Sequence, residues 1–442
     1  MTGGKRSSLP ETKHKPKAYS GPSFEEVLQH RKKFMPSLYF HYYKEPLLIY
    51  EGHGHYLWDH TGKRYLDLIS GISTVSVGHS HPRISKVVKE QVDTLTHISP
   101  IYMQQYQGEY SKMLCEQLGP GFDNVFLTNS GAEANDFAIL LARLYTNATK
   151  IISLRNGYHG LVGNTQGITN VGTWNQPTIR GIDHEKLAYP SSYRGLFKTT
   201  EDYIKDAEEA LNSNTSGRVA GFVAEPIMGV GGISPLPKDY LKHMYTLIRK
   251  YGGLCIADEV QTGFGRVGKD FWGFRWSGVQ PDIVTMAKGI GNGFPIGAVA
   301  TRKEITDVVK KVYFNTFGGG PIQCRVGMEV LKIIKDEKLH ENADTIGDYL
   351  MGRLKDIQSR SKILGDVRGK GLMIGAEIVK NKDTKEPCTE NTNRIMEGTR
   401  EAGLLFGKGG PFGNVIRIQP PLTITKADAD YVADVMEKLL VV

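Results

Sequence analysis

Short apolar runs and longer amphipathic stretches alternate through the middle of the chain. Segments such as 132–145 and 239–251 repeat apolar residues at helical spacing, and the runs between them are short enough for strands. This alternation predicts an α/β fold, with a mainly parallel sheet and helices on both of its faces. The predicted strands of this sheet are 124–127, 151–154, 219–224, 254–257 and 283–286.

The two ends of the chain show different patterns. Residues 47–70 contain short apolar runs separated by turn residues, which predicts a small antiparallel unit. Beyond residue 325, a helical pattern over 325–337 and 343–358 is followed by predicted strands at 371–379 and 414–418. We therefore expect a small α+β domain beside the large parallel-sheet domain. The expected parts are a flexible basic arm over 1–34, the N-terminal part of the small domain over 35–82, the large domain over 83–325 and the C-terminal small domain over 326–442.

Composition narrows the class of protein. The 442 residues, 40% hydrophobic and 23% charged, are typical of an ordinary soluble globular protein with two subdomains. No run of eighteen apolar residues is present, so no membrane span is expected. The net charge of +8 comes from scattered basic residues, which favours a solvated basic surface over a nucleic-acid site. Neither a disulfide framework nor a metal site is expected, because the cysteines are far apart and lack CxxC spacing: Cys115, Cys255, Cys324 and Cys388.

The first twenty residues carry five basic side chains, a single acidic one and no apolar face. This pattern predicts a flexible arm. It shares the scarcity of acidic residues with mitochondrial presequences, but it is neither amphipathic nor rich in arginine. The arm therefore leaves both a mitochondrial and a cytoplasmic location open. Its charged residues are Lys5, Arg6, Glu11, Lys13, Lys15 and Lys17.

Two charged residues follow strands of the predicted sheet. Asp258 comes directly after the run 254–257, and Lys288 follows the run 283–286. Because the carboxyl ends of parallel strands share one edge, where open α/β sheets bind ligands, we expect the two side chains to meet there. A pyridoxal phosphate enzyme needs this pair. The lysine forms a Schiff base with the cofactor, and the carboxylate keeps the pyridine nitrogen protonated.

Three further motifs could bind parts of the same ligand, although each also has a purely structural interpretation. Ser130, with Glu133 three residues later, is a capping box at a helix start, where free N–H groups could bind a phosphate. Tyr158 follows a predicted strand and could stack on a flat ring or belong to the core. Thr316, in the glycine-rich turn 315–321, could bind an anion or lie in a loop without a ligand.

The run 258–266 reads Asp-Glu-Val-Gln-Thr-Gly-Phe-Gly-Arg and is followed by Lys288, which lies between Ala287 and Gly289. Together these motifs resemble the signature of the class III aminotransferases. The resemblance spans about residues 35–440, which is nearly the whole chain. It implies an enzyme of fold type I among the transferases that depend on pyridoxal phosphate, with a large mainly parallel-sheet domain and a small α+β domain.

The resemblance also implies roles for residues around the cofactor ring. Lys288 would form the Schiff base and then move a proton between the substrate Cα and C4′ of the cofactor. Asp258 would pair with the pyridinium nitrogen, and Gln261 would reach the phenolic oxygen. Val260 and Tyr158 would pack against the two faces of the ring.

Other positions would bind the cofactor phosphate and the substrate. Thr316 would come from the neighbouring subunit, which implies a homodimer with shared active sites, either alone or within a tetramer. Glu225, in an Ala-Glu-Pro run, would lie near the cofactor. Arg417 would bind the substrate carboxylate, for which a guanidinium fork is well suited. The phosphate would be held by Ser130, Gly131 and Ala132.

One departure from the family pattern bears on the substrate. Ornithine and γ-aminobutyrate members carry a glutamate at the position of Val230, where it neutralises the arginine when a different end of the substrate must fit. A site with one fixed cation suits small monocarboxylates instead. We therefore expect a ping-pong transamination between alanine or a β- or ω-amino acid and a small 2-oxo acid, either glyoxylate or pyruvate.

Two other functions stay open on the sequence. Close relatives of the family are lyases that eliminate phosphate from phosphorylated amines, and these need an additional anion site. The other is a catalytically silent protein of the same fold, against which the intact Asp258, Lys288, Ser130 and Arg417 argue. The resemblance points to mitochondria, while the sequence also permits the cytoplasm.

Overall fold

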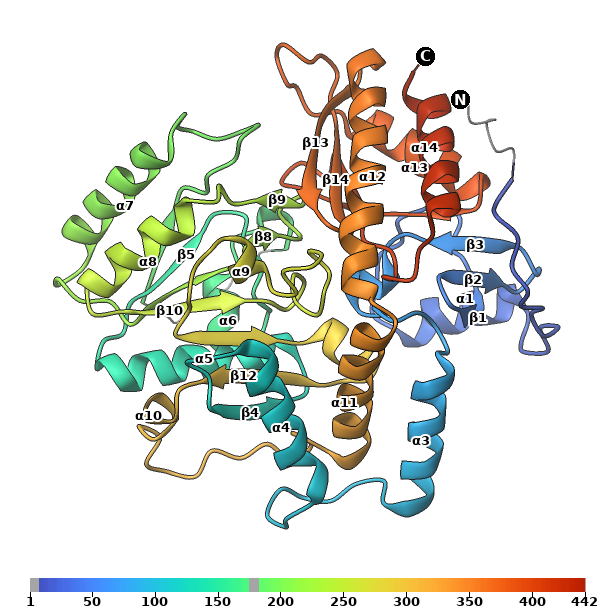
Figure 1. Ribbon diagram of the computed structural model, residues 1–442. Coiled ribbons are helices and arrows are strands. Elements are labelled where there is room, and N and C mark those ends of the chain that lie inside the picture. Colours follow the sequence, from blue (N-terminus) through green and yellow to red (C-terminus); the bar gives the residue numbers. More distant parts are fainter. Residues whose placement is uncertain (1–7, 175–182, 442) are drawn as a thin grey trace.

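The computed structural model describes residues 8–174 and 183–441, and its largest sheet has seven strands (Figure 1). Their order is β4 (Asn124–Thr128), β12 (Gly297–Thr301), β11 (Ile283–Met286), β10 (Leu254–Asp258), β7 (Gly221–Ala224), β5 (Ile151–Leu154) and β6 (His184–Leu187). Neighbouring strands run parallel except at β12, which is antiparallel to both β11 and β4. The predicted α/β fold with a mainly parallel sheet is therefore confirmed.

Helices cover both faces of this sheet, as the alternating patterns predict. α5 (Gly131–Thr146) packs on one face, whereas α7 (Thr200–Asn214) and α8 (Tyr240–Lys250) pack on the other. Adjacent strand residues alternate between the two layers, since Phe222 belongs to the core under α7 and α8 and Val223 to the core under α5. The sheet is thus buried on both sides, and its ligand-binding edge is left open.

Strand β12 lies outside the predicted strands and reverses the chain direction within the sheet. It pairs with β11 so that Met286 lies opposite Ala298. Its sequence, Gly-Ala-Val-Ala-Thr, contains two strand formers, of which only valine is apolar, so the apolar pattern gives little signal. A Cβ at Gly297 would lie 2.7 Å from the carbonyl oxygen of Ser130, so glycine lets β12 begin close beside the turn that precedes α5.

Two four-stranded sheets form the smaller part of the molecule. The first consists of β1 (Ile49–His53), β2 (Tyr56–Asp59), β3 (Arg64–Asp67) and β15 (Leu404–Leu405), and the second of β13 (Leu364–Lys370), β14 (Met373–Ile378), β17 (Val415–Ile418) and β16 (Gly407–Gly409). β1 to β3 are the predicted antiparallel unit. Because β15 pairs with β3, both ends of the chain contribute to one sheet. This pairing supports our proposal that residues 35–82 and 326–442 form one small domain beside the large domain over 83–325.

The remaining helices and strands pack around these sheets. α11 (Pro321–Asp336) contacts both α3 (Pro82–Thr94) and α4 (Gln105–Leu118), and α12 (Leu339–Arg360) lies between β13 and α14 (Lys426–Leu440). The other elements are α1 (Phe24–Phe34), α2 (Ser70–Ser73), α6 (Gly163–Ile168), η1 (Gly172–Trp174), β8 (Ile227–Met228), β9 (Ser234–Pro235), α9 (Gly273–Trp276), η2 (Lys288–Gly291), α10 (Lys303–Thr306) and α13 (Thr389–Glu401).

The N-terminal segment differs from the flexible arm expected over residues 1–34. Within it, residues 24–34 form helix α1, because the Ser23 hydroxyl accepts a hydrogen bond from the backbone N–H of Glu26 and caps the helix. Residues 1–7 of the expected arm lie outside the described residues.

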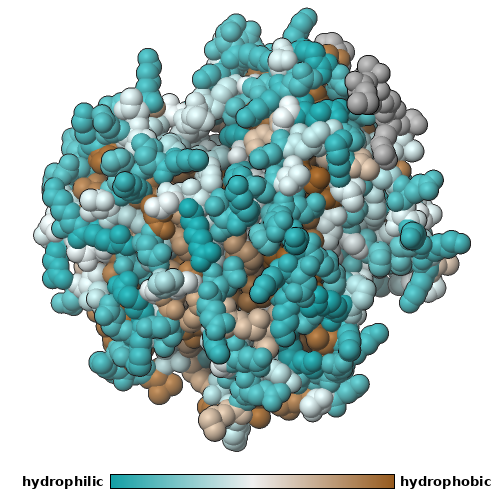
Figure 2. Space-filling model, viewed as in Figure 1, coloured by the Kyte–Doolittle hydropathy of each residue, from teal (hydrophilic) through white to brown (hydrophobic). Residues whose placement is uncertain are grey.

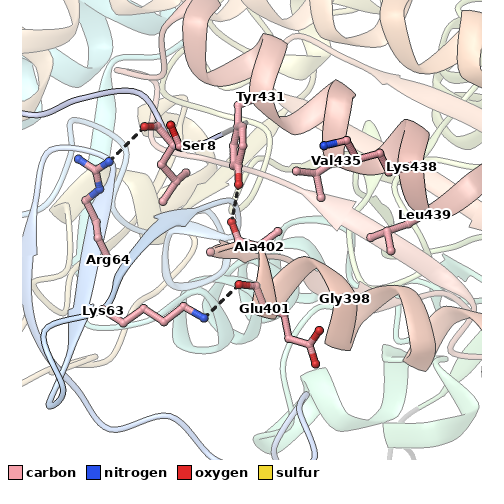
Figure 3. A pocket seen from close by; sticks show the side chains of 12 residues that line it. Ser8, Lys63, Arg64, Gly398, Glu401, Ala402, Tyr431, Val435, Lys438 and Leu439 are labelled. Carbon is pink, nitrogen blue, oxygen red and sulfur yellow. Dashed lines mark hydrogen bonds between the residues drawn. The ribbon is translucent and has the colours of Figure 1, made fainter. Parts of the chain in front are cut away.

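The stretch before α1 is docked on the small domain. Leu9 packs against the main hydrophobic core, and Arg64 donates a hydrogen bond of 2.7 Å to the carbonyl of Pro10. His14 Nε2 lies 2.5 Å from Glu51 Oε1 on β1. Figure 3 shows Arg64 reaching toward the segment that begins at Ser8. These contacts join residues far apart in the sequence, which explains why local composition alone predicts a flexible arm.

No helix within residues 8–174 and 183–441 is long and apolar enough to cross a membrane. The face of the molecule in Figure 2 is largely hydrophilic, in keeping with the scattered charges. Among the same residues, no group of histidine, cysteine or acidic side chains is placed to hold a metal ion.

A close approach of glycines fixes how the small domain lies against the motif at 258–266. Gly347, in α12, lies so near Gly371 that a Cβ would collide with the Gly371 carbonyl. Gly371 has a φ of +57°, and a Cβ there would lie 2.6 Å from the carbonyl oxygen of Arg266. The helix, the turn between β13 and β14 and the motif are therefore packed backbone against backbone, which glycine allows.

We expect Gly347→Ala to destabilise the protein even though alanine favours helices, because overpacking typically costs about 1–3 kcal/mol. Gly352, in the same helix, has open space where a Cβ would lie, so Gly352→Ala should stabilise by up to about 1 kcal/mol. Differential scanning calorimetry should show a lower unfolding temperature for the first variant and an unchanged or higher one for the second. Equal rises in both variants would contradict the close contact.

Candidate active site

A cavity of about 390 Å³ lies at the carboxyl-terminal edge of the large sheet. Asp258 ends β10 and Lys288 follows β11, and because these strands are parallel neighbours both residues reach this cavity. The sequence-predicted meeting of the two residues is therefore found in the structure. The predicted site residues that line the cavity are Ser130, Gly131, Ala132, Tyr158, Glu225, Asp258, Val260, Gln261 and Lys288.

The Asp258 carboxylate is buried and surrounded by hydrogen-bond partners. Oδ2 accepts a bond of 2.8 Å from the Asn135 amide and lies 2.8 Å from His159 Nδ1, and Oδ1 accepts a bond from the backbone N–H of Val260. The Thr285 hydroxyl donates to Asn135 Oδ1 and so fixes the orientation of that amide. A buried carboxylate is stable only with such partners. Asp258 is thereby held as an oriented acceptor.

Asn135 and His159 were not among the predicted site residues. His159 follows Tyr158 in the run that the sequence singles out, but nothing local marks it as the partner of an aspartate. Asn135 carries a detectable signal, because it is a polar residue on the buried face of α5, next to Ala134 and near Ala138. A buried polar side chain on an apolar helix face requires a partner, and here that partner is Asp258.

Lys288 occupies an unusual backbone conformation at the start of η2. Its φ is +52°, in the left-handed region that non-glycine residues rarely adopt. Such strain costs on the order of 1–3 kcal/mol and is concentrated at functional sites. Burial lowers the pKa of the Lys288 amine to about 8, against the opposing effect of the charges on Asp258 and Glu225. A far larger fraction of this amine is therefore neutral near pH 7 than for an exposed lysine.

Glu225 links the loops on either side of the cavity. Its Oε1 accepts a hydrogen bond of 3.0 Å from the backbone N–H of Tyr158, and its Oε2 accepts one of 2.9 Å from Gly229. Burial raises the pKa of Glu225, and the nearby charge of Asp258 adds to this effect. The Tyr158 ring lies edge-on to Trp174, with 5.5 Å between their centroids. Glu225 thus holds the tyrosine that lines the cavity.

One end of the cavity suits an anion, because it is formed by the first residues of helix α5. Ser130 is the N-cap, and its hydroxyl accepts a hydrogen bond of 3.2 Å from the backbone N–H of Glu133. A Cβ at Gly131 would lie 2.8 Å from a methyl group of Val260, so glycine keeps this turn close to the motif. Backbone N–H groups of a helix start and the helix dipole both attract a phosphate.

Two predicted site residues, Arg417 and Thr316, do not line this cavity. Arg417 lines a neighbouring cavity of about 490 Å³ and donates a hydrogen bond of 2.9 Å to Gln261 Oε1, which connects the two spaces. It is 2% exposed, burial lowers its pKa, and none of the ion pairs among the described residues includes it. Thr316 lies exposed in the loop before α11, outside both cavities.

A family model described as aminotransferase class III matches residues 39–440. The chain belongs to this family. It is 45% identical over 434 residues to alanine–glyoxylate aminotransferase 2 homolog 2, mitochondrial, of Arabidopsis thaliana, covering 98% of this chain and 91% of that protein. It is 40% identical over 458 residues to alanine–glyoxylate aminotransferase 2, mitochondrial, of Homo sapiens, covering 98% and 89%. Among solved structures, a phospholyase from Arthrobacter in complex with phosphoethanolamine has a TM-score of 0.87 and 31% identity, covering 94% of this chain and 99% of that one.

These comparisons confirm the resemblance to class III aminotransferases and the fold type I architecture. They also show that nearly the whole chain is similar to alanine–glyoxylate aminotransferase 2. The protein is a class III aminotransferase and its cofactor is pyridoxal phosphate, and aminotransferases of this family act on amino acids and 2-oxo acids.

The residues of the cavity fit this cofactor. The helix start at Ser130 suits the phosphate, the oriented acceptor Asp258 suits the protonated ring nitrogen, and Lys288 supplies the amine. The side-chain oxygen of Gln261, Oε1, accepts hydrogen bonds from Arg417 Nη2 and Gln419 Nε2. Its NH₂ group is therefore free to donate to the phenolic oxygen of the cofactor.

The lowered pKa of Lys288 predicts how the rate of cofactor uptake by the apo protein depends on pH. Only the neutral amine of Lys288 is nucleophilic, so the rate of coupling to pyridoxal phosphate should rise with pH to half its maximum near pH 8. Stopped-flow absorbance from pH 6 to 11 measures this rate, and the same series with butylamine corrects for ionisation of the cofactor. A half-maximum near the ordinary lysine value of 10.5 would contradict burial of the amine.

Proposed function

We propose that this protein transfers an amino group between alanine, or a β- or ω-amino acid, and a small 2-oxo acid, glyoxylate or pyruvate, by a ping-pong mechanism. The observation that carries the proposal is the buried Arg417, which has Val230 in its cavity, at the position where the resemblance implies a glutamate in ornithine and γ-aminobutyrate members. A cation without a neutralising carboxylate favours substrates with one carboxylate in a fixed position. The printed names of the two relatives from Arabidopsis thaliana and Homo sapiens agree with alanine and glyoxylate.

The described residues divide the chemistry between them. Pyridoxal phosphate, when bound, supplies an electron sink for the negative charge that develops at the substrate Cα. Lys288 moves the proton between this Cα and C4′ of the cofactor, for which an amine with a pKa of about 8 is well suited. Asp258, Val260 and Tyr158 line the cavity, where Asp258 would accept the hydrogen bond of the ring N–H and the other two would flank the ring faces. Glu225 holds Tyr158 in place.

The cavity around Arg417 supports a small substrate. The guanidinium binds the substrate carboxylate, and the surrounding walls are mainly apolar and aromatic. Such walls exclude water from the Cα. The cavity has a second cation, Lys408, whose ammonium group donates a hydrogen bond of 2.9 Å to Asn393 Oδ1. The apolar wall residues are Leu38, Phe40, Tyr42, Leu161, Trp174 and Val230.

We also propose a homodimer with shared active sites, alone or as half of a tetramer. Thr316 is exposed and absent from its own cavity, which supports its contribution to the phosphate site of a neighbouring subunit. Large apolar side chains are exposed around it and in the loop between α3 and α4, as at an interface. They include Ile101, Met103, Val312, Phe314 and Phe317. In Figure 2, hydrophobic atoms gather at the lower edge, where Figure 1 places the α3–α4 loop.

A mitochondrial location is proposed on the names of the same two relatives. The second candidate function is the elimination of phosphate from a phosphorylated amine. The similarity to the phospholyase structure from Arthrobacter supports it. This reaction consumes no 2-oxo acid. Ammonium release from phosphoethanolamine without an acceptor would identify it.

The proposal predicts that wild-type protein transfers the amino group of alanine to glyoxylate and that Val230→Glu impairs this reaction. The introduced carboxylate would pair with Arg417 and compete with the substrate, so kcat/KM for alanine should fall about tenfold or more. Val230→Gln has the same length without the charge and should keep kcat/KM within about threefold of wild type. Coupled assays of pyruvate formation measure these values. An inactive wild type, or equal losses in both variants, would refute the proposed role of Arg417.

A further inference from the structure

The loop that carries Thr316 is anchored at both ends on its own chain. The Tyr313 ring stacks on Phe137 of α5, with centroids 4.4 Å apart. At the other end, the Gly319 carbonyl accepts hydrogen bonds of 3.0 Å from Gln104 and 3.1 Å from Gln107. The exposed threonine therefore lies between two anchors on its own chain.

A hub of hydrogen bonds joins this loop to the turn before α5. A single oxygen of Glu133, Oε2, accepts bonds from the backbone N–H of Asn129 (2.8 Å), the Asn129 amide (3.1 Å) and the Asn315 amide (3.1 Å). The oxygen of Asn315 in turn accepts bonds from the Asn129 amide (2.8 Å) and the backbone N–H of Gly318 (3.1 Å). These groups are partly buried, and three of the bonds end on a carboxylate, which makes them stronger than neutral ones.

The hub lies between two structures that serve different active sites. Asn129 directly precedes Ser130, at the phosphate end of the chain's own cavity. Asn315 directly precedes Thr316, which is outside that cavity and exposed. The capping role of Glu133 uses its backbone N–H, which leaves its carboxylate to bind across to the loop. A plain helix cap needs no such bond to a segment almost two hundred residues away.

We propose that Glu133 and Asn315 are positioning residues that tie the phosphate-binding turn of one active site to the loop that completes the other. This inference rests on the proposed dimer with a shared Thr316. Binding of the cofactor phosphate orders the turn, and the hub passes this order to the loop that the partner uses. Cofactor binding at the two sites is then positively coupled, and by linkage the coupling acts equally in both directions.

Hybrid dimers separate the two sites for measurement. A chain with Lys288→Ala cannot couple covalently to pyridoxal phosphate, so the yellow absorption band reports only the site of its wild-type partner chain. In the test hybrid the Lys288→Ala chain also carries Asn315→Ala, and in the reference hybrid it does not. The apparent Kd of the reporting site for pyridoxal phosphate should be about tenfold weaker in the test hybrid, equivalent to about 1.4 kcal/mol.

A third hybrid, with Thr316→Ala on the Lys288→Ala chain, separates this inference from the dimer on which it rests. Weaker binding with both Asn315→Ala and Thr316→Ala supports the hub. Weaker binding with Thr316→Ala alone overturns the hub and leaves the shared site intact. Unchanged binding with both overturns the shared site as well.

Glu133→Gln provides a second variant if Asn315→Ala fails to assemble. It keeps the length of the side chain and removes the charge that three donors share, so it should weaken the reporting site in the same direction. The wild-type dimer should also titrate with a Hill coefficient above one, and the homodimer with Asn315→Ala should titrate with a coefficient of one. A coefficient of one in wild type would contradict the coupling.

Discussion

A buried carboxylate requires partners, and the active site is built around the partners of Asp258. Helix α5 supplies Asn135, the loop after β5 supplies His159, and β11 supplies Thr285, which orients the Asn135 amide. The parallel register places Thr285 directly opposite Asp258, three residues before Lys288. One hydrogen-bonded cluster therefore sets the relative positions of the Asp258 carboxylate, the Lys288 amine and helix α5, whose first residues suit a phosphate.

The small domain adds Arg417, the proposed substrate-binding residue, through a second buried contact. Arg417, on β17, lines one cavity and donates a hydrogen bond to Gln261, whose side chain lines the other. A Cβ at Gly229 would collide with the Gln261 side chain, so the loop that Glu225 holds also leaves room for this amide. The cofactor residues and the substrate residue are thus linked by direct contacts rather than by proximity in the sequence.

The sequence predicts those site residues that lie at the ends of contiguous apolar segments. Asp258 ends one apolar strand, Lys288 follows the next and Ser130 caps an amphipathic helix. Their place at one sheet edge therefore follows from strand order in a parallel sheet. His159 and the docking of His14 on Glu51 depend on contacts between distant segments, which local patterns do not encode. Strand β12 is not predicted, because most of its residues are small and have a weak preference for strands. Its pairing with neighbouring strands compensates for this weak preference.

The central claim is that this site moves nitrogen from an amino acid to a 2-oxo acid rather than releasing it. The most direct measurement follows ¹⁵N from labelled alanine, with glyoxylate as acceptor, by mass spectrometry of the products. The account predicts that the label appears in glycine in a one-to-one ratio with the pyruvate formed. Label recovered as ammonium, or alanine left unchanged, would contradict it.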